Sequence, residues 1–169
     1  LYNGSFETWS TDGNIASWIL SEGVDNDFLA VPARKVPGAA NDNTSAIEIP
    51  APKTEDKLVV LAQTIQPGKI VPKHKLYLSA LAKSPEKEKL HMVLNYKVGQ
   101  NTETARRVCQ GTGQWEKLET SFWVPAEADP KSFRLQFLMQ KGAKQPAQID
   151  DVRLQMMVPK GTPAAKPAP

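Results

Sequence analysis

An alternation of apolar side chains with mostly polar ones over residues 90–98 limits the folds that this chain can adopt. Its apolar positions are Leu90, Met92, Leu94, Tyr96 and Val98, and the residues between them are His91, Val93, Asn95 and Lys97. A period of two places every second side chain on the same face of a β-strand. A strand with one apolar face must bury that face against a second layer, so this segment predicts a sheet packed on another sheet.

Other segments of the chain show the same period. Alternation is also clear over residues 76–82, 117–124 and 133–140, and shorter strand candidates cover residues 45–49, 58–65, 104–108 and 149–156. No window shows a convincing helical period, because Pro or Gly interrupts nearly every stretch that is long enough. The sequence therefore predicts an all-β domain, with two antiparallel sheets packed as a β-sandwich or closed as a barrel.

Composition excludes several classes of function. The 21 Lys and Arg residues are interleaved with 18 Asp and Glu residues, for a net charge of +3, which does not favour nucleic acid as a partner. One Cys and two His residues are too few for a tetrahedral zinc site or an intrachain disulfide. The longest conspicuous apolar run, residues 58–62, is far shorter than the roughly 18 residues of a membrane span.

The end of the sequence differs from the rest. Residues 159–169 contain four prolines and no large apolar side chain, which is typical of a semi-rigid linker or tail. We therefore expect one domain over residues 1–158. Since the sequence begins at Leu1 without an initiator Met, we expect any targeting signal to lie outside this segment.

Four motifs, in order, carry a resemblance to a known family. The sequence reads Asn-Gly-Ser-Phe-Glu at residues 3–7, Gln-Thr-Ile at 63–65 followed by Tyr-Leu-Ser-Ala at 77–80, Trp115 through Pro125, and Ile-Asp-Asp-Val-Arg-Leu at 149–154. This pattern resembles the carbohydrate-binding modules of the family 4/9/22-like superfamily, which are galactose-binding-like jelly rolls. The resemblance covers nearly the whole domain and implies a jelly-roll β-sandwich.

The resemblance also implies a structural calcium ion. Modules of this kind bind Ca²⁺ between the Glu of the opening motif and an Asp of the closing motif, which correspond here to Glu7 and Asp150. The carbonyl of Gly4 or Ser5 and one carbonyl of residues 43–45 would complete the oxygen ligands, and Asp151 is the alternative to Asp150. Oxygen ligands of this type suit Ca²⁺. The other interpretation is that these carboxylates are solvated surface charges.

A sugar site would lie on the outward face of one sheet. If the apolar side chains point into the core, the outward positions hold His91, Asn95, Lys97, Arg134, Gln136 and Gln140, with Gln63 and Tyr77 nearby. Planar polar side chains of this kind bind sugar hydroxyl groups. We expect Trp18 and Trp115 to belong to the scaffold, and we expect Trp123 to be exposed and to belong to the ligand-binding residues. A solvated strand face remains the alternative for His91 and Asn95, and Trp9 lies in a loop of unknown direction.

Three functions follow from this, in order of preference. The first is a non-catalytic carbohydrate-binding module of an extracytoplasmic protein, which would hold an attached domain near a polysaccharide. The second is a structural or protein-interaction module whose contact surface surrounds Trp123. The third is a hydrolase, which is disfavoured because no recognisable set of acid, base and nucleophile is present. Cys109 is expected to be a buried structural thiol.

Overall fold

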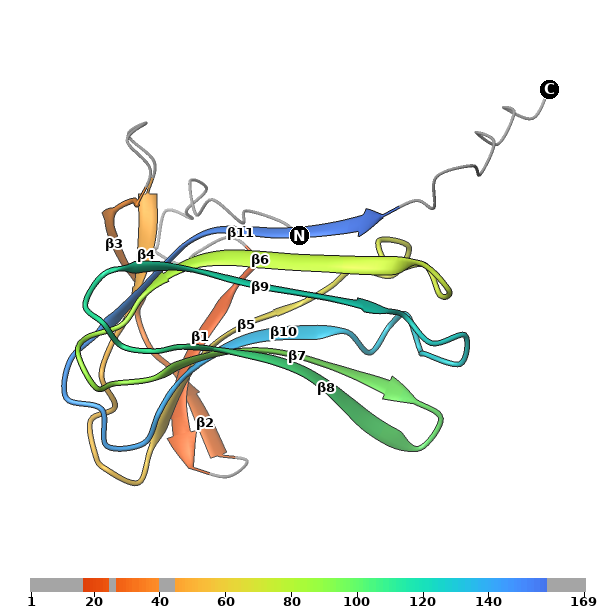
Figure 1. Ribbon diagram of the computed structural model, residues 1–169. Coiled ribbons are helices and arrows are strands. Elements are labelled where there is room, and N and C mark those ends of the chain that lie inside the picture. The colour runs from red at the N-terminus through yellow and green to blue at the C-terminus, as the bar shows by residue number, and fades with distance from the viewer. Residues whose placement is uncertain (1–16, 25–26, 40–44, 158–169) are drawn as a thin grey trace.

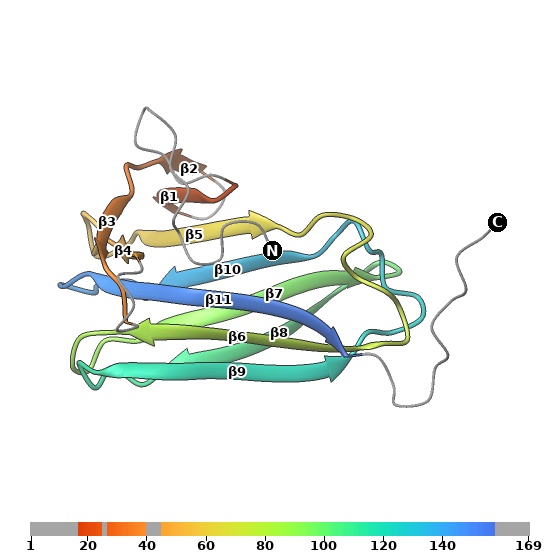
Figure 2. The same ribbon diagram turned by 90° about the horizontal axis from the view of Figure 1, so that it is seen from above.

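The protein folds into two packed antiparallel sheets. The computed structural model describes residues 17–24, 27–39 and 45–157, and these form a six-stranded sheet and a five-stranded sheet (Figure 1). Seen from above, strands of the five-stranded sheet cover those of the other (Figure 2). The prediction of an all-β sandwich is therefore confirmed. Within the described residues no helix is long and apolar enough to cross a membrane.

The strands of the two sheets alternate along the chain. The six-stranded sheet has the order β2 (Asp27–Ala30), β1 (Ile19–Val24), β5 (Leu58–Thr64), β10 (Arg134–Met139), β7 (Leu90–Val98) and β8 (Asn101–Cys109). The five-stranded sheet has the order β3 (Arg34–Pro37), β4 (Ser45–Ile49), β11 (Ala147–Met157), β6 (Lys75–Lys83) and β9 (Trp115–Trp123). Apart from the consecutive pairs β1/β2, β3/β4 and β7/β8, neighbouring strands come from distant parts of the sequence, so each sheet also brings together residues that are far apart in the chain.

The core lies between the sheets and follows the alternation seen in the sequence. Along β7, Leu90, Met92 and Leu94 are buried, whereas His91 and Asn95 are half-buried on the outer face. Tyr96 stacks between two rings of the core, 4.8 Å from Phe133 and 5.4 Å from Phe122 between ring centroids. Stacked aromatic rings in a close-packed interior fix the relative position of the sheets.

The structure also corrects two expectations. Three strands, β1, β2 and β3, were not expected from the sequence. Trp18 is buried in the core as expected, but Trp115 is only half-buried, on the outer face of the five-stranded sheet. Trp123 is 60% exposed and Cys109 is fully buried, as the sequence indicated. Trp9 and the segment 159–169 lie outside the described residues.

Candidate binding groove

The outward face of the six-stranded sheet carries most of the predicted polar residues. The register of β5, β10, β7 and β8 places Ala62, Gln136, Val93 and Arg106 in one row across the sheet. The rows on either side continue with Leu138 beside His91 and with Arg134 beside Asn95. Because side chains alternate between the two faces of a strand, all of these point away from the core.

Part of this face is hollowed into a groove of about 370 Å³. We define the binding groove by the residues that line it: Leu58, His91, Val93, Asn95, Arg106, Gln136, Leu138, Met139, Gln140 and Lys141. Its volume lies within the range of small-molecule sites. The aliphatic side chains form the floor, and the amides, the imidazole and the guanidinium supply polar groups above it. None of the lining residues is Phe, Tyr or Trp.

Side-chain hydrogen bonds hold the polar groups of the groove in place. Asn95 Nδ2 donates to Gln136 Oε1 at 2.8 Å, and Thr104 Oγ1 donates to Asn95 Oδ1, also at 2.8 Å. This chain crosses three strands and fixes the orientation of both amides. Gln136 takes part in this chain through its oxygen. Within the described part of the chain its Nε2 atom donates no hydrogen bond, so its N–H groups can bind a ligand.

A second contact at the groove joins His91 to Arg106. The Nε atom of Arg106 donates to His91 Nδ1 at 3.1 Å, and its second guanidinium nitrogen lies 2.6 Å from the same atom. Desolvation by burial lowers the pKa of His91, and the positive charges of Arg106 and Lys89 lower it further. A neutral imidazole can accept a hydrogen bond from a guanidinium, whereas an imidazolium cannot.

The structure brings some of the predicted ligand residues together and separates others. His91, Asn95, Gln136 and Gln140 all line the groove, and Arg134 is exposed on the same face opposite Asn95. Lys97 is also exposed on β7. These positions confirm that the polar side of each strand faces outward, although they leave the roles of the residues as predictions.

Gln63, Tyr77 and Trp123 do not lie at this groove. Gln63 is buried, and its Nε2 atom donates to the carbonyl of Ser17 at 3.1 Å. Tyr77 belongs to β6 of the other sheet, where its hydroxyl donates to Glu119 Oε2 at 2.6 Å. Trp123 ends β9, next to β6 in that same sheet. The predicted ligand set is therefore divided between two sides of the molecule.

Sequence reasoning missed several residues of the groove. Arg106 and the aliphatic pair Val93 and Leu138 line the groove but were not singled out as ligand contacts, and neither was Thr104, which donates to Asn95. The tight turn between β7 and β8 held the signal, since pairing Val98 with Asn101 places Val93 opposite Arg106. Counting back from that turn would have identified Arg106, because the register of a hairpin is fixed by its turn.

The carboxylate predicted to bind calcium lies on the other sheet. Asp150 is 1% exposed, at a bulge of β11; its Oδ2 accepts from Ala39 N at 2.8 Å and its Oδ1 from Asp151 N at 2.7 Å. Asp151 is in the left-handed region, with φ of 46°, and pairs with Arg153 at 2.7 Å. Asp150 is thus the buried member of the pair. Gly4 and Glu7 lie outside the described residues.

The fold was compared with solved structures. The enzymatically active domain of tailspike protein 4 of bacteriophage CBA120 has a TM-score of 0.63 and 17% identity; the match covers 93% of this chain and 21% of that domain, so the chain spans about a fifth of it. A family 61 carbohydrate-binding module in complex with β-1,4-galactotriose has a TM-score of 0.61 and 16% identity, over 93% and 97% of the two chains.

A third similar structure is the C-terminal family 22 carbohydrate-binding module of Clostridium thermocellum Xyn10B. Its TM-score is 0.59 at 16% identity, and the match covers 92% of this chain and 95% of that module. No protein-family model matches the sequence, and no curated protein matches it. Modules of families 4 and 16 share the same architecture. The chain therefore has the jelly-roll fold of carbohydrate-binding modules, which confirms the resemblance at the level of the fold.

Proposed function

We propose that this domain is a non-catalytic carbohydrate-binding module and that the binding groove on the six-stranded sheet holds a segment of a polysaccharide. The observation that carries this proposal is the chain of hydrogen bonds from Thr104 through Asn95 to Gln136, above an aliphatic floor. Amides whose orientation is fixed bind sugar hydroxyl groups without losing side-chain entropy. The aliphatic floor receives the C–H face of a sugar ring.

The composition of the groove indicates the strength of binding. None of the residues that line it is Phe, Tyr or Trp, so a sugar ring has aliphatic contacts and hydrogen bonds but no large aromatic stacking partner. Each net hydrogen bond contributes about 1 kcal/mol. We therefore expect a dissociation constant nearer the millimolar than the micromolar range. Useful retention on a polymer would then come from the high local concentration of repeated binding sites.

Retention on insoluble polysaccharides tests the proposal. We expect the domain to sediment with at least one neutral polymer of β-1,4-linked sugars, and Asn95→Ala to reduce the bound fraction. Asn101→Ala is the matched control, because Asn101 is an exposed asparagine on the same hairpin that does not line the groove. Equal loss of binding in both variants would count against the groove.

A second candidate function rests on Trp123. This side chain is 60% exposed at the end of β9, and Met157, 49% exposed, lies two strands away in the same sheet row. An exposed Trp is typical of protein interfaces. In this alternative the domain is a structural or protein-interaction module. Trp123→Ala would then abolish capture of a protein partner. Under the first proposal, glycan retention depends on the binding groove, and Trp123→Ala leaves the retention unchanged.

We also propose that Asp150 binds a structural Ca²⁺ together with Glu7 and the carbonyl of Gly4. Asp150 fits such a role, because it is a buried carboxylate whose oxygens accept hydrogen bonds from Ala39 N and Asp151 N, and a carboxylate oxygen can accept from more than one partner. The described residues alone contain no group of three His, Cys, Asp or Glu side chains able to hold a metal ion. The proposal therefore depends on the residues of the opening motif.

The same reasoning extends to location. Modules that bind polysaccharides act where the polymer is, so the proposed function implies an extracytoplasmic protein. In this setting the segment 159–169 would serve as a linker that joins the module to another domain. The module would then increase the effective concentration of that domain at the polysaccharide surface.

A further inference from the structure

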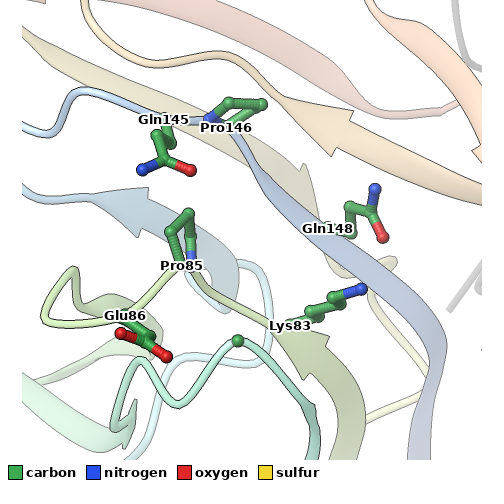
Figure 3. A pocket seen from close by; sticks show the side chains of 7 residues that line it. Lys83, Pro85, Glu86, Gln145, Pro146 and Gln148 are labelled. Atoms are coloured by element: carbon green, nitrogen blue, oxygen red, sulfur yellow. The ribbon is translucent and has the colours of Figure 1, made fainter.

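A second hollow lies at one end of the sandwich, where three loops meet. Its volume is about 420 Å³, and its loop residues are Pro85, Glu86, Gly113, Gln145 and Pro146 (Figure 3). Two strand residues complete the lining, Lys83 at the end of β6 and Gln148 near the start of β11. The size falls within the usual range of ligand sites. We refer to it as the loop-end hollow.

The loop-end hollow and the binding groove lie on different sides of the molecule. Lys83 and Gln148 face each other across β6 and β11 in the five-stranded sheet, as Figure 3 shows. Both alternate with buried residues, Ala82 and Ile149, so their side chains point to the outer face of that sheet. The groove is on the outer face of the other sheet, so one sugar residue cannot contact both.

The walls of the loop-end hollow are held by hydrogen bonds between the loops. The carboxylate of Glu88 accepts from Lys144 N at 2.6 Å and from Gln145 N at 3.2 Å. Gly113 N donates to Ser84 O at 2.9 Å, and the buried Ser84 hydroxyl donates to Glu88 O at 2.8 Å. All three loops are thus joined through Ser84 and Glu88. A cavity with fixed walls needs little reorganisation to bind a ligand.

The chemistry of the lining favours a neutral, hydroxylated ligand. Gln145 and Gln148 each offer amide donors and an acceptor, and the one cation, Lys83, is balanced by the one anion, Glu86. The proline rings of Pro85 and Pro146 add rigid apolar surface. No excess charge selects an ion, whereas a sugar residue can use amide groups, charged donors and acceptors, and apolar surface together.

An aromatic side chain lies beside the loop-end hollow. Trp115 is the register partner of Lys83 across β9 and β6 and is half-buried on the same outer face. The row therefore runs from Trp115 through Lys83 to Gln148. Large aromatic faces pack against the C–H face of a sugar. An indole ring next to polar groups is therefore a favourable combination, and the binding groove lacks it.

We propose that the loop-end hollow is a second sugar-binding site, which takes a neutral sugar residue of a polysaccharide, so that one domain binds two separate chain segments. The inference rests on the proposed function only for the class of ligand, since its residues and its sheet face are different. Two sites on one rigid domain bind two chains or two stretches of one chain, and this increases retention on a polymer.

Nuclear magnetic resonance distinguishes the two sites. The labelled domain is titrated with xylohexaose and with β-1,4-galactotriose at millimolar concentration, and the side-chain amide signals of Gln145, Gln148, Asn95 and Gln136 are followed. The expected result is a shift of the Gln145 and Gln148 signals, together with a shift of the backbone amide signal of Gly113, which lines the hollow, and this Gly113 shift is lost in the Gln145→Ala/Gln148→Ala variant. Gln114→Ala is the control, because Gln114 is an exposed glutamine that follows Gly113 in the same loop but does not line the hollow.

Each outcome decides between the two proposals. Shifts at both pairs of amides support both sites, and shifts at Gln145 and Gln148 alone support the loop-end hollow while the groove fails. Shifts confined to Asn95 and Gln136 overturn the second site and leave the groove supported. No shift at either pair overturns both. Equal loss of the Gly113 shift in the Gln114→Ala variant and in the double variant would also overturn the second site.

Discussion

Asn95 and Gln136 lie on neighbouring strands, and the side-chain N–H of Asn95 donates to the side-chain carbonyl of Gln136 at 2.8 Å. Gln136 also lines the groove, and this bond occupies its side-chain oxygen and leaves its N–H groups available to a ligand. We predict that Gln136→Ala weakens sugar binding about tenfold, because one or two hydrogen bonds to the ligand are lost. Isothermal titration measures the change. An unchanged affinity in a folded variant would contradict the assignment of Gln136 to the site.

The contact between His91 and Arg106 predicts a dependence of stability on pH. Burial and the neighbouring positive charges lower the pKa of His91 from its ordinary value of 6.5. Between the lowered pKa and 6.5 the unfolded chain binds more protons than the folded one. The free energy of unfolding must therefore increase as the pH rises toward 6.5 and lose this contribution as the pH falls through the lowered pKa.

Chemical denaturation at several pH values measures this effect. His91→Gln should flatten the dependence below pH 6.5, since glutamine does not titrate, and the difference between the two proteins isolates His91 from the other histidine, His74. Protonation would also remove the acceptor for Arg106 and free the guanidinium from the groove. If both proteins show the same dependence on pH, the folded state does not favour the neutral imidazole.

Glu88 is predicted to hold the loops around the loop-end hollow. Its carboxylate accepts two backbone N–H groups, those of Lys144 and Gln145. Glu88→Ala should lower the free energy of unfolding by about 2 kcal/mol, the usual contribution of hydrogen bonds to a charged group. Amide hydrogen exchange at residues 144 and 145 should become faster. Glu86→Ala is the control, because Glu86 is an exposed carboxylate two residues earlier.

Removal of calcium tests the proposed metal site. An ion that binds only the folded state must stabilise it, so added Ca²⁺ should raise the melting temperature and EDTA should lower it. Glu7→Gln and Asp150→Asn should each remove the response to Ca²⁺. Asp151→Asn should retain it, because Asp151 pairs with Arg153 rather than with the buried site. A melting temperature that changes neither with EDTA nor with added Ca²⁺ would contradict the proposed calcium site.

Alternation made the central strands predictable and left other parts of the fold hidden. β7 could be placed to the residue, because every second position from Leu90 to Val98 is apolar and is buried in the core or packs against it. β3 could not, since Arg34, Lys35 and Pro37 are exposed on a short edge strand with no apolar face to detect. Edge strands of this kind are short and polar because pairing on their free side must be avoided.

Burial on both faces of a strand explains why Gln63 was misplaced. In β5 both faces are buried over part of the strand: Val59 and Leu61 face the core, and Val60 and Ala62 on the outer face are also covered. A continuous apolar run hides which face is which, so Gln63 was placed with the ligand residues although it is buried. Tyr77 and Trp123 were misplaced because the sequence does not say which sheet a strand joins.

Titration with β-1,4-linked oligosaccharides tests directly whether the groove binds sugar. The domain is compared with the double variant Asn95→Ala/Gln136→Ala, and retention on insoluble polysaccharides is measured in parallel. We predict that the original domain binds at least one neutral oligosaccharide measurably and that the variant binds it at least tenfold more weakly. Circular dichroism confirms that both proteins are folded. Equally strong binding by the variant would contradict the proposal that the groove binds a polysaccharide. So would the absence of binding by the folded domain to any of the oligosaccharides and polysaccharides.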